Sequence, residues 1–280
     1  LLVTRGNDTA ALNELIRKEE AVVSELNQII SYWDITANIF EYSKAKDGRF
    51  FQNACKVRQN ASIPAEVLRY HILYTHYTIS GQPELGLVQL EKLVQLLEQR
   101  PDYIRDDPGA YTTALNNQIS SLVFMRRYET VQALLNKVKS VPEEYKLHSD
   151  SLFTIKLQLR TYNIELELYR DTRQWDKGHQ LINEITAYLR KHRNAVSSEY
   201  LIQFWYQFAY IYFMRREYSA ALKWVNELIN TNFKTNRQDL QQYARLLNLM
   251  IHFEMGNTFV LKYAVDSTRR FLNTGPHGSC

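Results

Sequence analysis

Histidine and cysteine are the residues of this chain best suited to catalysis or metal binding, and their spacing supports neither. The seven histidines are scattered. The two that are nearest in sequence, His71 and His76, would project about 140° apart on a helix and could not easily share a metal ion. Cys55 and Cys280 form no CxxC motif, and no nucleophile, phosphate-binding or zinc-peptidase motif is present. We therefore expect a non-catalytic protein with no metal site and no cofactor.

A turn signature occurs five times between amphipathic stretches: an aromatic residue or a proline stands three positions before a residue that is usually small. The copies begin at Pro83, Tyr128, Trp175, Tyr218 and, less clearly, Thr258, so they are 40 to 47 residues apart. Such a period is typical of helical hairpins that stack on one another. We expect each aromatic side chain to be buried against the first helix of its own hairpin, and each small residue to allow close helix packing.

Helical periodicity extends over almost the whole chain, which has only nine glycines and six prolines in 280 residues. Residues 9–46 have the apolar spacing of one long helix or two joined helices, and Ser62 is the expected N-cap of the first repeat helix. The first five prolines all stand at predicted helix boundaries. The remaining helices are predicted at residues 65–80, 84–99, 111–125, 129–141, 151–170, 176–192, 199–214, 219–230, 237–254 and 258–272.

These elements predict an all-α fold, a right-handed α-solenoid of about five stacked antiparallel hairpins with an extra N-terminal helical segment. Residues 1–62 would form that segment and pack on the array, and residues 63–272 would form the repeats. Residues 273–280 read as an irregular tail, either a natural end or a remnant from outside the natural protein. No composition shift or flexible linker divides the chain, so one continuous array is expected.

The turns resemble those of the tetratricopeptide-repeat family, whose units carry a glycine and an aromatic residue followed three positions later by alanine. The units here exceed the family's 34 residues, and Val131 and Leu261 replace the small residue, as in the lengthened, divergent arrays of many bacterial proteins. The resemblance covers residues 63–272 and implies a scaffold that binds other proteins. The matching segments are Gly81-Gln82-Pro83-Glu84-Leu85-Gly86, Arg127-Tyr128-Glu129-Thr130-Val131, Gln174-Trp175-Asp176-Lys177-Gly178 and Glu217-Tyr218-Ser219-Ala220-Ala221.

The resemblance also implies a concave groove along the first helix of each hairpin, lined by the residues fifteen, twelve and eight positions before the turn residue. Asparagine can pair with both the donors and the acceptors of an extended peptide, and tyrosine offers rigid amphipathic contact area. Asn116 and Asn163 are therefore expected at the surface. The candidate groove residues are His71, Thr75, Asn116, Ser120, Asn163, Glu167, Gln203, Tyr206 and Tyr210.

Two arginine pairs recur after a Phe-Met dipeptide, Arg126-Arg127 and Arg215-Arg216. Cations near a helix C-terminus complement the helix dipole, and this interpretation is favoured. The alternative is a basic edge along the array that contacts an acidic partner or RNA.

Charge and hydropathy narrow the choice of partner. The 34 basic and 30 acidic residues give a net charge of +4 and are mixed along the chain, which disfavours a nucleic-acid partner. No apolar run is long enough for a membrane span. We expect a cytoplasmic scaffold that binds a peptide or helix of another protein. The alternatives are a regulatory or sensor array within a longer protein, and a nucleic-acid-binding solenoid that uses the arginine edge.

Overall fold

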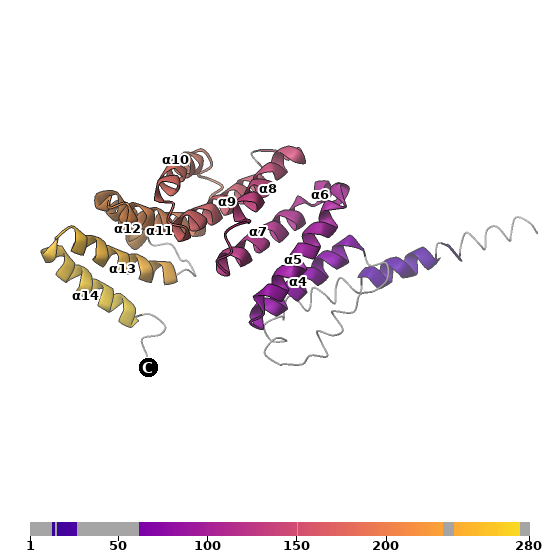
Figure 1. Cartoon of the computed structure of the whole chain (residues 1–280), viewed down its shortest axis with the longest axis horizontal. Helices are drawn as coiled ribbons and strands as arrows, with labels where there is room; N and C mark the ends of the chain where they lie inside the picture. Colours follow the sequence, from indigo (N-terminus) through magenta and orange to yellow (C-terminus); the bar gives the residue numbers. More distant parts are fainter. Residues whose placement is uncertain (1–12, 15, 27–61, 150, 232–237, 275–280) are drawn as a thin grey trace, which may run out of the picture. The chain divides into compact units, whose positions relative to one another are not determined.

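The computed structural model of the chain describes residues 13–14, 16–26, 62–149, 151–231 and 238–274. Of these residues 84% are helical and none lies in a strand, which confirms the predicted all-α class (Figure 1). The chain divides into two compact units, residues 1–134 and 135–280, and each is described by itself. Residues 13–14 and 16–26 are helical. Most of the predicted N-terminal segment 1–62 lies outside the described residues, so its packing on the repeats stays a prediction.

In the first unit, helix α5 packs against both α4 and α7. The side chains of Ser62 and Asp107 each accept a backbone N–H three residues later, and a proline occupies the first turn, which explains where α4 and α7 begin. Leu90, Leu93 and Leu97 of α5 are fully buried and form much of the core. The helices are α4 (Ile63–Ile79), α5 (Pro83–Glu98), the short α6 (Pro101–Asp106) and α7 (Pro108–Phe124).

In the second unit, each helix from α9 to α14 packs against the next one in the chain, and α11 also contacts α9 and α13. The helices α9, α11 and α13 are thus the neighbouring first members of three hairpins. Phe204 and Phe208 of α11 are fully buried at the centre, with their rings 5.9 Å apart. The helices are α8 (Val131–Glu144), which begins in the first unit, α9 (Leu152–Asp171), α10 (Trp175–Lys191), α11 (Ser198–Met214), α12 (Tyr218–Asn230), α13 (Gln238–Glu254) and α14 (Thr258–Thr274).

A buried carboxylate connects α8 to α9. Glu165 is only 4% exposed, and one of its oxygens pairs with Lys139 of α8 at 2.7 Å. The other oxygen accepts the Tyr169 hydroxyl at 3.1 Å. Burial raises the pKa of Tyr169 to about 12, and the neighbouring Glu165 carboxylate adds to the effect. Both carboxylate oxygens therefore have partners, as a buried charge requires.

The five hairpin turns share one backbone geometry. In each, a residue in the left-handed region follows the end of the first helix, with φ between 57° and 75°. The next residue donates its N–H to the carbonyl five positions earlier, at 2.8 to 3.0 Å. This is the Schellman arrangement, which satisfies carbonyls at the end of a helix. The first residue of the turn signature, identified from the sequence, always stands two positions after the left-handed residue. The left-handed residues are Gly81, Arg126, Arg173, Arg216 and Gly256.

The small residues of the signature lie where helices approach most closely. A Cβ on Gly86 would stand 3.2 Å from the main-chain oxygen of Tyr74 in α4. A Cβ on Gly178 would stand 3.0 Å from the end of the Ile211 side chain in α11. Ala221 is fully buried. Glycine or alanine at these positions is therefore explained by packing.

The aromatic residues of the signature are less buried than expected. Tyr128, Trp175 and Tyr218 are each half-buried. The Trp175 ring lies 6.4 Å from that of Tyr210, on the first helix of the following hairpin, whereas its own first helix was expected. The pocket for this aromatic residue is therefore formed in part by a neighbouring hairpin.

Two prolines and the end of α14 depart from their predicted roles, and α7 begins at Pro108 and not at the predicted residue 111. Pro142, expected to end a helix, lies inside the last turn of α8. Pro101, also expected only as a terminator, begins the six-residue helix α6, because proline fits the first turn of a helix. Helix α14 continues to Thr274, so the predicted tail from residue 273 begins too early, and residues 275–280 lie outside the described part. None of the helices in the described ranges is long and apolar enough to cross a membrane.

Candidate functional site

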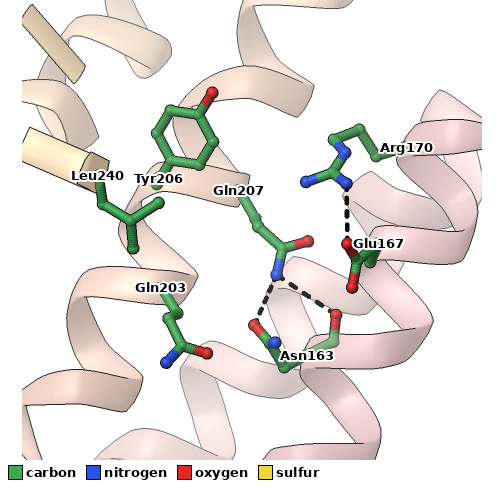
Figure 2. A pocket seen from close by; sticks show the side chains of 7 residues that line it. All are labelled: Asn163, Glu167, Arg170, Gln203, Tyr206, Gln207 and Leu240. Atoms are coloured by element: carbon green, nitrogen blue, oxygen red, sulfur yellow. Dashed lines mark hydrogen bonds and ion pairs between the residues drawn. The ribbon is translucent and has the colours of Figure 1, made fainter. Parts of the chain in front are cut away.

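A cavity of about 230 Å³ opens between α9, α11 and α13 in the second unit (Figure 2). Three of its lining residues are four or three positions apart on α9 and therefore share one helix face. Three more come from α11 and one from α13. The lining residues are Asn163, Glu167, Arg170, Gln203, Tyr206, Gln207 and Leu240. Most of them are polar, although they stand on helices whose opposite faces form the core.

A half-satisfied carboxamide lies at the base of this cavity. Gln207 is only 5% exposed. Its Nε2 donates to the side-chain oxygen of Asn163 at 2.6 Å and to the Asn163 main-chain carbonyl at 3.3 Å. A main-chain carbonyl can only accept a hydrogen bond, so the Gln207 atom that faces it must be the nitrogen and not the oxygen. The Gln207 oxygen, Oε1, has no hydrogen-bond partner, and in Figure 2 it is turned away from Asn163.

Two charged side chains, Glu167 and Arg170, line the cavity together with this amide. Arg170 donates to Glu167 at 3.2 Å and to Asp171 at 2.9 Å. Burial lowers the pKa of Arg170, but the carboxylates of Asp171 and Glu167 outweigh it and hold that pKa above its ordinary value. Two carboxylates thus neutralise Arg170.

Tyrosine rings connect the cavity to the next hairpin. Tyr206 lies 6.5 Å from Tyr210 on its own helix and 6.2 Å from Tyr243 on α13, measured between ring centroids. Burial raises the pKa of Tyr206, and the nearby Arg170 partly opposes the shift. Tyr206 therefore stays neutral at physiological pH and can present both a ring face and a hydroxyl group.

An exposed apolar face on α13 continues from these rings. Its four members repeat at helical spacing and are 46% to 71% exposed: Tyr243, Leu246, Met250 and Phe253. We call this set the α13 apolar face. Ala244, Leu247 and Ile251 adjoin this face on the helix and are all buried in the core. The apolar side of α13 is therefore wider than the part that the core of this unit covers.

The structure separates the predicted groove residues into two groups. Asn163, Glu167, Gln203 and Tyr206 line the cavity, and Tyr210 stands next to Tyr206. The other four, on α4 and α7, belong to the first unit: His71, Thr75, Asn116 and Ser120.

The groove residues of the first unit make hydrogen bonds within their own helices, and their place in a groove stays a prediction. The hydroxyl of Thr75 donates to the carbonyl of His71 at 2.9 Å, and that of Ser120 to Asn116 at 2.8 Å, each within its own helix. Burial lowers the pKa of His71. Asn116 is only 2% exposed, so its expected surface position is wrong. Neighbouring helices cover α7 at three consecutive positions, 114 to 116, and this burial is invisible in a single repeat.

Sequence reasoning missed three residues of the cavity, Arg170, Gln207 and Leu240. A signal was present for one of them. Gln207 is the only amide in the otherwise apolar and aromatic run from Phe204 to Phe208. A polar side chain in such a run must find partners inside the fold or in a ligand.

The two arginine pairs do not occupy equivalent positions. The residue in the left-handed conformation is the first arginine of one pair, Arg126, but the second arginine of the other pair, Arg216. The two pairs are therefore offset by one residue relative to their turns, and Arg127 is equivalent to Glu217. Arg215 is paired with Glu217 at 2.6 Å and also with Asp176. The shared Phe-Met-Arg-Arg sequence therefore does not place the two pairs at equivalent positions of their hairpins, and Arg215 is paired within the fold.

Comparisons with protein-family models, with curated proteins and with solved structures found no match. The functional argument therefore depends on the cavity and its surroundings. These groups can hold a ligand by hydrogen bonds, charge and ring contacts.

Proposed function

We propose that this chain is a non-catalytic polypeptide-binding scaffold, built as a right-handed tetratricopeptide-like α-solenoid, and that it binds its partner across α9, α11 and α13. The observation that carries the proposal is the polar cavity next to the α13 apolar face. Buried side-chain oxygens without a partner also occur at Asn116, Gln118 and Asn248, so the Gln207 oxygen supports the proposal through its place at a polar cavity beside four exposed apolar side chains.

The chemistry of the site suits a polypeptide. Main-chain amides need both donors and acceptors, and the carboxamides of Asn163, Gln203 and Gln207 offer both. Side chains need apolar and aromatic area, which Tyr206 and the α13 apolar face provide. The turn geometry repeated at five hairpins supports the tetratricopeptide-like architecture. The cysteine usage, two residues 225 positions apart, supports a reducing compartment such as the cytoplasm.

Selection from a displayed library of random dodecapeptides tests the proposal. The wild-type chain should enrich peptides that bind it, and Tyr206→Ala should weaken the resynthesised peptides at least about tenfold, as for a central aromatic contact residue. Tyr263→Ala is the matched control, because Tyr263 is a 60% exposed tyrosine on α14, outside the cavity. Circular dichroism checks that both variants remain folded. No enriched peptide, or equal losses in both variants, would contradict the proposal.

A further inference from the structure

The α13 apolar face has a counterpart on α11 that is much less exposed. Helices α12 and α14 begin 40 residues apart, at Tyr218 and Thr258, so each residue of α13 corresponds to the residue 40 positions earlier on α11. The four members of the α13 apolar face are 46% to 71% exposed, whereas their counterparts are half-buried. The counterparts are Gln203, Tyr206, Tyr210 and Phe213.

Helix α13 itself supplies the cover on α11. Its buried residues join two apolar clusters with residues of α11 and α12, and Tyr206, Tyr210 and Phe213 pack against these clusters. Among the described helices, none takes the corresponding place beside α13, which packs against α11, α12 and α14. The residues with which α13 covers α11 are four, three and four positions apart: Leu240, Ala244, Leu247 and Ile251.

The spacing of the α13 apolar face suits a helix as its cover. Its members are three, four and three positions apart, which is the pattern of the a and d positions where one helix packs along another. An extended segment would place main-chain N–H and C=O groups against this apolar stripe without partners, which costs free energy. A helix satisfies these groups internally and presents only side chains.

We propose that the partner binds as an amphipathic α-helix along the α13 apolar face, in the place beside α13 that α13 takes beside α11. This inference rests on the proposed function and specifies its partner. The apolar residues of the partner helix recur at three- and four-residue spacing, as those on the buried side of α13 do.

The polar cavity suits one end of such a helix. Tyr243, at the beginning of the α13 apolar face, contacts Tyr206, which lines the cavity (Figure 2). A helix leaves four main-chain groups without an internal partner at each end. The half-buried carboxamides of Asn163 and Gln203 line the cavity and can pair with such groups. One helix therefore uses both the cavity and the α13 apolar face.

Two exposed phenylalanines test where the helix lies. Phe253 belongs to the α13 apolar face and is 71% exposed, and Phe259, on α14 and outside this face, is 74% exposed. Phe253→Ala should weaken a peptide from the dodecapeptide selection at least about tenfold, as for an aromatic contact residue. Phe259→Ala is the matched control and should leave the affinity unchanged. Thermal unfolding of both variants shows whether a loss of affinity comes from a loss of fold.

The selected peptide tests whether the partner is helical. Twelve residues form a helix of about 18 Å, long enough to cover a stripe of ten residues on α13. Proline in place of a polar residue in the middle of the peptide should lower the affinity at least about tenfold, because proline disrupts a helix, and alanine at the same position should not. The isotope-labelled peptide, bound to the chain, should show helical carbon chemical shifts.

The outcomes separate this inference from the proposed function. Peptides that Tyr206→Ala weakens but that tolerate proline would overturn the inference and leave polypeptide binding standing. Equal effects of Phe253→Ala and Phe259→Ala would overturn it in the same way. A library that yields no binding peptide would overturn both proposals.

Discussion

Replacing Arg173 by glycine should stabilise the second unit, although the substitution removes an entire side chain. Arg173 is exposed and has a φ of 59°, in the turn between α9 and α10. Its N–H donates to the carbonyl of Arg170, and the next N–H donates to that of Tyr169. These bonds hold the left-handed conformation that a Cβ disfavours and that glycine adopts freely.

The expected gain follows from two opposing effects. The left-handed conformation costs an L-residue roughly 1–2 kcal/mol, and glycine avoids that cost. Glycine also makes the unfolded chain more flexible, which costs about 0.4–1 kcal/mol. The net stabilisation should be about 0.5–1 kcal/mol. Arg173→Ala keeps a Cβ and should change the stability by less than about 0.5 kcal/mol, as is usual for a surface substitution.

Urea unfolding followed by tryptophan fluorescence measures this change in the appropriate unit, because three of the four tryptophans lie in residues 135–280. Arg190→Gly is the matched control. Arg190 is exposed in the last turns of α10, where glycine should destabilise by about 0.5–1 kcal/mol. If Arg173→Gly destabilises the unit as much as Arg190→Gly does, Arg173 does not hold the left-handed position and the turn geometry described here is wrong.

Two further predictions concern close packing and a buried tyrosine. Gly86→Ala should lower the melting temperature more than Gly178→Ala, by an amount that corresponds to about 1 kcal/mol. The reason is that the new Cβ meets a main-chain oxygen at Gly86, but only the movable end of the Ile211 side chain at Gly178. Equal effects of the two substitutions would contradict this reasoning. The pKa of Tyr169 is raised to about 12, above the unfolded value near 10, so its stabilising contribution is complete below pH 10 and is lost as the pH rises toward 12. Tyr169→Phe should therefore flatten the decline in stability over this range, measured by urea unfolding, and an unchanged slope would show that Tyr169 titrates normally.

Most helices could be predicted because their boundaries are encoded locally. Ser62 caps α4 as predicted, whereas Asp107 caps α7, which begins at Pro108 and not at the predicted residue 111; the other observed ends fall within a few residues of the predicted ones. Helix α6 was missed because six residues are too few to show a helical period. Pro142 was predicted to end a helix because a proline inside a helix removes a main-chain hydrogen bond, yet α8 continues to Glu144.

The candidate site was harder to predict because burial depends on neighbouring hairpins. A fixed offset from the turn selected Asn163 and Tyr206, which line the cavity, and also Asn116, which is buried. The same offset cannot tell the two asparagines apart, since the difference lies in what covers each helix. The unpaired oxygen of Gln207 can be identified only when the direction of its amide is known.

The most direct test of the central claim is an amide NMR titration of the isotope-labelled chain with a dodecapeptide from the selection that carries a nitroxide at one end. We predict chemical-shift changes and paramagnetic broadening concentrated on α9, α11 and α13, around Asn163, Gln207 and Leu246. Broadening confined to the first unit or to α14, with the signals of α9 and α11 unchanged, would contradict the claim that the partner binds at this cavity.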